Sequence, residues 1–333
     1  MRPRLDRWRC RLDARQRLPA RRRRWTGGAT APCRRAWRTI KALFWALCLG
    51  SATAHGADCE IASFTEPLGE GTTAYQVAGS GPDVLLLHGL FAQKEQWNDV
   101  LCTLANAGYR ASAVDLPGYG QSKGYPVEVY ALENQVALID RLMQRRGITR
   151  FHLAGNSMGG AIAALYARSY PQHVASLAFI GGTLGIGEWA ALVRQAIVSG
   201  VNPFIPLAEA QLDLELRLLL TRVPELPPDA KQAMIAAYID DQLHHRQVWD
   251  IVNLYGNALR SLPANRLPTL IVWGKQDLIF DVAGVQQLVD KYPASRQVLL
   301  DGVGHLPMLD APALTARIYI DFLRHSLLHV VPK

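Results

Sequence analysis

Three residues far apart in the chain have the types and the order that nucleophilic acyl transfer requires. Ser157 lies in the run GNSMG, Asp277 ends the run WGKQD, and His305 ends the run DGVGH. A serine hydroxyl is a weak nucleophile and needs a histidine base that a carboxylate holds in place. We therefore expect Ser157 to be the nucleophile, His305 the general base and Asp277 the acid behind the base.

The acid has a rival in the same loop. Asp281 lies four residues after Asp277 and directly precedes a helical segment that begins at Val282. A short acidic side chain at that place typically caps the helix. We expect Asp281 to be the cap and Asp277 the acid, with Asp281 as the alternative acid.

Two backbone amides are predicted to stabilise the oxyanion of acyl transfer. One belongs to Met158, which follows the nucleophile at the start of a helix. The other is expected in the run HGLF, where a glycine lets the chain turn and Leu90 presents its N–H, with Phe91 as the alternative donor. His88 in this run is expected to brace the loop by hydrogen bonds rather than to act in catalysis. The run DLPGYG that begins at Asp115 is expected to form a structural turn.

The elements that must position these residues predict a parallel sheet. From about residue 72, apolar strand-like runs alternate with helical segments, which is typical of a mostly parallel, doubly wound α/β sheet. Ser157 lies between a strand and a helix, as a nucleophile elbow requires. The candidate residues all follow strands and should therefore meet at the carboxyl edge of the sheet. The expected strands are 73–78, 84–88, 111–115, 151–154, 174–181, 269–273 and 297–300, and the expected helices of the core are 95–107, 129–146, 159–170, 282–292 and 313–327.

The alternation is broken between residues 185 and 265. This stretch has helical runs separated by prolines and lies between two expected strands, so we expect a helical cap over the strand ends. Its apolar residues suggest a hydrophobic acyl group or lipid as substrate, although they could equally pack the cap onto the core.

The expected domain organisation is a targeting segment at 1–57, core at 58–184, cap at 185–265 and core at 266–333. The cap helices are expected at 188–198, 208–220, 229–243 and 248–259, and four histidines outside the site, His244, His245, His325 and His329, are expected to be solvated.

Charge is distributed unevenly along the chain. Residues 1–57 carry 15 basic and two acidic side chains, and residues 58–333 carry 21 basic and 26 acidic ones. Because the folded part is mildly acidic, nucleic-acid binding is not expected. The basic segment, an apolar stretch and the small residues that end at Ala54 have the order of a secretory signal. We expect an exported protein, periplasmic or secreted, cleaved after Ala54, or one that stays attached to a membrane through residues 42–54.

Cysteine content is consistent with export but does not decide the pairing. Cleavage after Ala54 would leave Cys59 and Cys102. In an exported domain these two could form one disulfide, or they could be two separate thiols. No Cys/His spacing suggests a zinc site, and neither a metal nor an organic cofactor is expected.

Together these motifs resemble the α/β-hydrolase fold family, over roughly residues 70–330. The runs HGLF, DLPG, GNSMG and WGKQD and the dipeptide GH that ends at His305 carry the resemblance. The longer runs IVWGKQDLIFDVAG and LHGLFAQKEQW are similar to monoacylglycerol lipases and lipase-like esterases with a short helical cap. The resemblance implies a serine ester hydrolase that acts on a small ester or lipid. Relatives of this kind often have an apolar N-terminal anchor, which favours attachment through residues 42–54.

The residue at the elbow limits the alternatives within that family. Haloalkane dehalogenases and epoxide hydrolases of this fold have an aspartate where this chain has Ser157. Carbon–carbon bond hydrolases and cofactor-free haloperoxidases keep the same triad and stay open as alternatives. A non-catalytic receptor that uses the same pocket is a third interpretation. The oligomeric state is not predicted.

Overall fold

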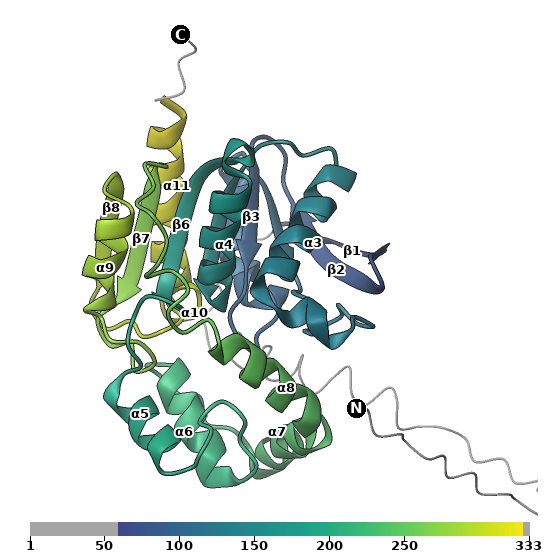
Figure 1. The fold of residues 1–333 in the computed structure, drawn as a ribbon, viewed down its shortest axis with the longest axis vertical. Helices are drawn as coiled ribbons and strands as arrows, with labels where there is room; N and C mark the ends of the chain where they lie inside the picture. Colours follow the sequence, from purple (N-terminus) through teal and green to yellow (C-terminus); the bar gives the residue numbers. More distant parts are fainter. Residues whose placement is uncertain (1–58, 329–333) are drawn as a thin grey trace, which may run out of the picture.

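The sheet is mostly parallel, as expected from the sequence. The structure, a computed structural model, describes residues 59–328, and within them eight strands form one sheet in the order β1-β2-β4-β3-β5-β6-β7-β8 (Figure 1). The first two strands pair antiparallel with their neighbours, and all other neighbours pair in parallel. The strands are β1 Ala62–Leu68, β2 Gly71–Ala78, β3 Asp83–Leu87, β4 Arg110–Val114, β5 Phe151–Ser157, β6 Val174–Thr183, β7 Thr269–Gly274 and β8 Ser295–Leu300.

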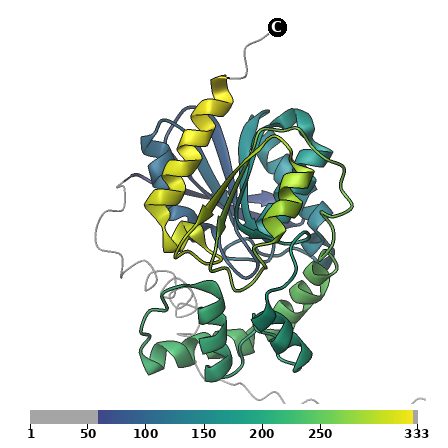
Figure 2. The same ribbon diagram turned by 90° about the vertical axis from the view of Figure 1, so that its left-hand side faces the viewer.

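Helices cover both faces of the sheet (Figures 1 and 2). On one face lie α3, α4 and α9, and on the other lie α2 and α11. Strands β5 and β7 are therefore buried along their whole length, which explains the continuous apolar run LIVW in β7. The core helices are α2 Asn98–Asn106, α3 Leu132–Arg145, α4 Met158–Ser169, α9 Gly284–Lys291, α10 Pro307–Asp310 and α11 Pro312–Leu328, with 3₁₀ turns η1 Lys94–Trp97, η2 Val127–Tyr130 and η3 Pro171–His173.

The first strand, β1, is missing from the sequence prediction. Its residues are exposed except at the end, because the strand lies at the edge of the sheet and is only partly covered. Without a buried face, the strand has no apolar alternation by which it could be recognised.

Four helices lie between β6 and β7, and we call α5–α8 the helical insertion. They are α5 Ala191–Val198, α6 Glu209–Leu219, α7 Pro228–Asp240 and α8 Gln242–Asn253. Figures 1 and 2 show them beyond the carboxyl ends of the parallel strands. The last of them begins at Gln242 rather than at the expected residue 248.

The expectation of solvated histidines is wrong for two of the four. His245 is buried and His244 is partly buried, because α8 packs against loops of the core. The His325 side chain is 67% exposed, as expected. His329 lies outside the described residues.

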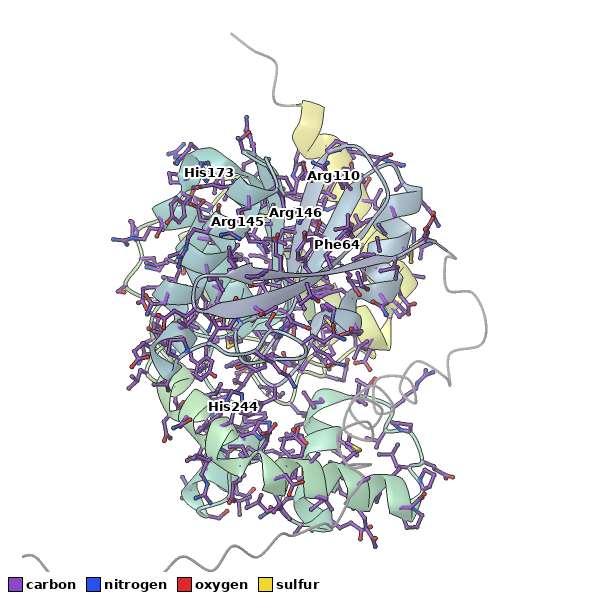
Figure 3. The ribbon with its side chains drawn as sticks, turned by 90° about the vertical axis from the view of Figure 1, so that its right-hand side faces the viewer. Phe64, Arg110, Arg145, Arg146, His173 and His244 are labelled. Atoms are coloured by element: carbon purple, nitrogen blue, oxygen red, sulfur yellow. A yellow bond between two sulfur atoms is a disulfide. The ribbon has the colours of Figure 1, made fainter. Side chains whose placement is uncertain are left out.

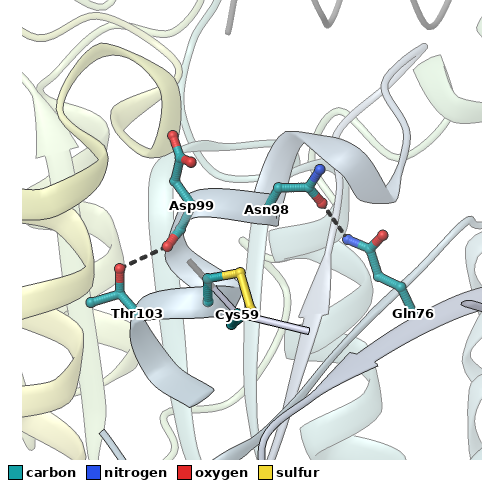
Figure 4. Close-up of a disulfide and its surroundings, with 6 residues drawn as sticks. Cys59, Gln76, Asn98, Asp99 and Thr103 are labelled. Carbon is teal, nitrogen blue, oxygen red and sulfur yellow. Dashed lines mark hydrogen bonds between the residues drawn. A yellow bond between two sulfur atoms is a disulfide. The ribbon is translucent and has the colours of Figure 1, made fainter. Parts of the chain in front are cut away.

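A disulfide joins Cys59 to Cys102, which decides between the two alternatives left by the sequence. It ties the chain ahead of β1 to α2 (Figure 4). Close by, the Gln76 side chain donates a hydrogen bond to Asn98 Oδ1 at 2.6 Å, so the start of α2 is also attached to β2. The bridge fits the expected export.

Two further expectations concern membranes and metals. Among residues 59–328 there is no helix both long and apolar enough to cross a membrane, and no cluster of three or more His, Cys, Asp or Glu side chains that could hold a metal ion. The expected targeting segment, including residues 42–54, lies outside the described residues.

Candidate active site

Ser157 lies on a sharp turn between β5 and α4. It is the last residue of the strand, and its φ of 53° is in the left-handed region, which costs a non-glycine residue about 1–3 kcal/mol. Two glycines make the turn possible. A methyl group on Gly155 would lie 2.2 Å from the Gly159 carbonyl oxygen, and one on Gly159 would lie 2.4 Å from the Leu87 oxygen. The sequence therefore folds into the strained elbow that the GNSMG motif predicts.

Asp277 and His305 are hydrogen-bonded to each other. The distance between Asp277 Oδ2 and His305 Nδ1 is 3.0 Å, and both side chains are almost fully buried. The other carboxylate oxygen accepts the backbone N–H groups of Ile279 and Phe280 at 2.8 and 3.1 Å. These three bonds fix the orientation of the carboxylate and, through it, of the imidazole.

Asp281, the rival acid, has a different partner. Its side chain accepts the Ala283 backbone N–H at 2.9 Å, just ahead of α9. The helix begins at Gly284 rather than at the expected Val282, so this bond closes a local turn ahead of α9 and is not the helix cap expected of Asp281. Of the two candidates, Asp277 is the one whose carboxylate bonds His305.

Asn156 connects the elbow to the loop that carries the histidine. Its Nδ2 donates to the carbonyl oxygens of Ile180 at 2.8 Å and His305 at 3.2 Å. The residue next to Ser157 thus holds the end of β6 and the backbone of His305 together. Sequence reasoning missed this role, because Asn156 occupies the unspecified position of the motif and its partners are far away in the chain.

The run HGLF passes close to Ser157, the expected nucleophile. A methyl group on Gly89 would lie only 3.1 Å from Ser157 Cβ. The following residues are partly buried Leu90 and then Phe91, whose φ of 55° is also in the left-handed region. The loop that was expected to supply an oxyanion donor therefore lies beside the elbow, and the other expected donor, Met158, begins α4.

His88 has the bracing role expected for it. It is fully buried, accepts the Leu116 N–H at 2.9 Å through Nε2, and donates from Nδ1 to the Gly89 carbonyl at 2.7 Å. Burial lowers the pKa of His88 to about 4, although the Asp115 carboxylate nearby acts in the opposite direction. A neutral imidazole thus links the loops that follow β3 and β4.

A buried ion pair supports the same two loops. Lys94 Nζ lies 2.9 Å from Asp115 Oδ2, and neither side chain is more than 3% exposed. The Lys94 and Gln121 backbone N–H groups add hydrogen bonds to this carboxylate at 2.8 Å each. Burial acts to lower the pKa of Lys94, but the carboxylates of Asp115 and Glu95 raise it overall. The turn at Asp115 is structural, as expected; its partner Lys94 was not predicted.

Aromatic rings from a core loop and from the insertion form a row beside His305. The Phe280 ring lies 5.7 Å from the His305 ring and stacks on Trp189 at 4.7 Å. Trp189 in turn lies 5.8 Å from Phe204 and 6.1 Å from Trp249. An apolar wall shared by core and insertion therefore lies alongside the Asp277–His305 pair.

Comparison with known proteins agrees with the fold and the motifs. A sequence model of the alpha/beta hydrolase fold family matches residues 82–312. The protein "Monoacylglycerol lipase abhd6-B" of Xenopus laevis is 30% identical over 264 residues, which cover 75% of this chain and 78% of that protein. "Lipase 1" of Psychrobacter immobilis is 27% identical over 274 residues, covering 80% and 84% respectively.

A solved structure extends the comparison to three dimensions. It is the crystal structure of a membrane phospholipase A, described as a bacterial virulence factor, which superposes with a TM-score of 0.75 at 28% identity. The match covers 86% of this chain and 93% of that one. The chain therefore belongs to the α/β-hydrolase fold family, in its lipase- and esterase-like branch.

Proposed function

We propose that this hydrolase cleaves carboxylic esters of hydrophobic acyl groups through an acyl-enzyme on Ser157. The observation that carries the proposal is the 3.0 Å hydrogen bond between Asp277 and His305 Nδ1, made in a loop that Asn156 holds against the elbow. Because Nδ1 is engaged by the carboxylate, Nε2 is the ring nitrogen left to act as base. This is the division of roles in a serine triad.

The reaction follows from these roles. His305 Nε2 takes the proton of Ser157 Oγ as the oxygen attacks the ester carbonyl carbon. The backbone N–H groups of Leu90 and Met158 stabilise the resulting oxyanion, and each donor contributes about 10²–10³ in rate. The protonated imidazole gives its proton to the leaving alcohol. A water molecule, deprotonated by the same nitrogen, then attacks the acyl-enzyme and releases the carboxylic acid and the free serine. No step needs a metal or an organic cofactor.

The substrate proposal rests on the surroundings of the base. The aromatic wall that includes Phe280 and Trp189 offers an acyl chain an apolar surface. We take the helical insertion, with residues 185–265, as a cap that selects the substrate over a core of residues 58–184 and 266–333. Relatives named as lipases and a phospholipase favour a lipid ester as the substrate.

We also propose that the protein acts outside the cytoplasm, exported or attached to a membrane through residues 42–54. The Arg-rich segment and the Cys59–Cys102 disulfide support an oxidising compartment. Cell fractionation with N-terminal sequencing tests this. A mature protein that begins after Ala54 supports export, an intact N-terminus in the membrane fraction supports attachment, and an intact soluble protein in the cytoplasm contradicts both.

Labelling with a fluorophosphonate probe tests the chemistry. Wild-type protein should be labelled, and Ser157→Ala should lose both the label and about 10⁶ in kcat. The matched control is Ser199→Ala, a serine of the insertion that bonds only locally to Ala196, and it should keep both. Absence of labelling in the wild type, or full labelling of Ser157→Ala, contradicts the proposal.

A substrate panel tests the bond that is cleaved. We expect p-nitrophenyl esters of increasing chain length to be hydrolysed faster than a vinylogous diketone. Preference for the diketone would identify a carbon–carbon bond hydrolase that uses the same residues.

A further inference from the structure

Helix α8 of the insertion contacts the loops that follow β3 and β4, and the first of these lies beside Ser157. His244 Nε2 donates to the Gly118 carbonyl oxygen at 2.9 Å, in the loop after β4. Figure 3 shows His244 where the insertion meets the core. The next residue, His245, is buried with its ring edge-on against Phe91, in the loop after β3, at 4.9 Å and 81°. Two consecutive histidines thus attach one helix to two core loops.

Phe91 is the residue that needs such support. Its φ of 55° is disfavoured for any side chain with a Cβ. A conformation of this kind persists only where its surroundings hold it in place. Among the residues that the structure describes, the Phe91 ring has two aromatic neighbours. They are Tyr119 of the core at 6.4 Å and His245 of the insertion at 4.9 Å.

The direction of the Leu90 N–H depends on this conformation. Leu90 directly precedes Phe91, so rotation of the backbone at Phe91 shifts the whole HGLF turn relative to Ser157. An oxyanion donor is effective only within a narrow range of distances from the developing charge. Contacts that hold Phe91 in this conformation therefore also hold the Leu90 N–H in position.

We propose that His245 is a positioning residue: it holds Phe91 and thereby aims the Leu90 N–H at the oxyanion. The inference rests on the proposed function, since it requires that Leu90 stabilises an oxyanion. The packing of α8 against the core loops then affects the rate of the chemical step, because it holds the Leu90 N–H in position.

A double-mutant cycle on a p-nitrophenyl ester tests the proposal. His245→Ala and Phe91→Ala should each lower kcat about tenfold with KM changed less than about twofold, a smaller loss than removal of a donor. The double variant should lose no more than about the larger single loss, because both changes break one contact. His245→Phe, which keeps an aromatic ring, should recover kcat to within about threefold of the wild type.

The matched control breaks a contact between insertion and core elsewhere. Tyr255, just beyond the end of α8, donates a hydrogen bond to Glu133 of α3. Tyr255→Phe should loosen the insertion but leave kcat unchanged. A loss of kcat in this variant equal to that in His245→Ala would overturn a specific role for His245.

The remaining outcomes also decide the matter. Losses that multiply to about a hundredfold in the double variant overturn the proposal, as does a change confined to KM, which would show that α8 acts on substrate binding. If His245→Ala does not fold, Phe91→Leu tests the same contact from the core side, and unchanged kcat in that variant overturns the proposal. Absence of ester hydrolysis in the wild type would instead contradict the proposed function itself.

Discussion

The proposed acid, Asp277, and the proposed oxyanion loop around Leu90 are held in place by different means. Asp277 is fixed within its own loop, by backbone N–H groups two and three residues further along the chain. The loop of Leu90 is held instead by contacts with parts of the chain that are far away in the sequence. His88 accepts the Leu116 N–H, Lys94 pairs with Asp115, and Phe91 contacts α8 of the insertion. A side chain that reacts can be positioned locally. A backbone amide has no side chain of its own, and other parts of the fold must position it.

The largest effect on kcat is expected when the proposed acid, Asp277, is replaced. In Asp277→Asn the amide can still occupy the loop, but it cannot hold the imidazole in the required tautomer or stabilise its charged form. We expect kcat to fall about 10⁴-fold. Steady-state kinetics on a p-nitrophenyl ester measures this.

The control for that prediction is the neighbouring carboxylate. Asp281→Asn should change kcat less than about twofold, because the asparagine oxygen can accept the same Ala283 N–H in the turn before α9. A large loss in Asp281→Asn together with a small one in Asp277→Asn would reverse the assignment of the acid.

The contrast also explains what the sequence predicts. Ser157, Asp277 and His305 could be proposed from short runs, because each needs a particular side chain on a particular strand end. The glycines around Ser157 are visible in the sequence for the same reason, since the elbow admits no larger residue there. The parallel sheet is likewise predictable, because strands buried on both faces are rich in apolar residues, as in the runs of β3 and β7.

What the sequence does not predict is the set of long-range supports. The roles of Asn156 and Lys94 depend on partners brought near by the fold. Likewise, α8 was expected to begin at residue 248, so the histidine pair was assigned to solvent. Polar residues on a helix look solvated in a sequence, and only the packing of that helix onto the core loops shows that His245 is buried.

A second prediction breaks the support of the proposed oxyanion loop. Lys94→Met removes the cation from a fully buried pair and leaves the Asp115 carboxylate uncompensated, which costs about 3–5 kcal/mol. Thermal unfolding should show a melting temperature lower by about 10 °C. The control is Lys275→Met, in the loop that carries Asp277. Its exposed ion pair with Asp301 should contribute less than about 1 kcal/mol to the free energy of unfolding. An equal fall in melting temperature in Lys94→Met and Lys275→Met would contradict the difference between the two loops.

A third prediction concerns acid sensitivity. Burial lowers the pKa of His88 from 6.5 to about 4. Above pH 6.5 the imidazole is neutral in both the folded and the unfolded state. As the pH falls from 6.5 to 4, the unfolded state binds a proton that the folded state does not, so the free energy of unfolding falls by about 3 kcal/mol.

Chemical denaturation at several pH values measures that effect. His88→Gln should be less stable at neutral pH, but its stability should depend less on pH between 6.5 and 4. His325→Gln, in which an exposed histidine is replaced, should keep the pH dependence of the wild type. An unchanged slope in His88→Gln would show that the acid sensitivity originates elsewhere, for example at His152, whose pKa burial also lowers to about 4.

The smallest effect tests whether the Tyr119 hydroxyl helps to align the proposed oxyanion donors. Buried Tyr119 donates a hydrogen bond to Met158 Sδ at 3.6 Å, and its ring lies 6.4 Å from the ring of Phe91. Tyr119→Phe keeps the ring and removes only the hydrogen bond, so kcat should fall about threefold to tenfold with little change in KM. Tyr125→Phe is the matched control, because it loses a buried hydrogen bond to Thr73 on β2; its melting temperature should fall while kcat stays unchanged. If Tyr119→Phe also loses only stability, the loops beside Ser157 are held by ring packing alone, and the hydroxyl has no part in aligning the donors.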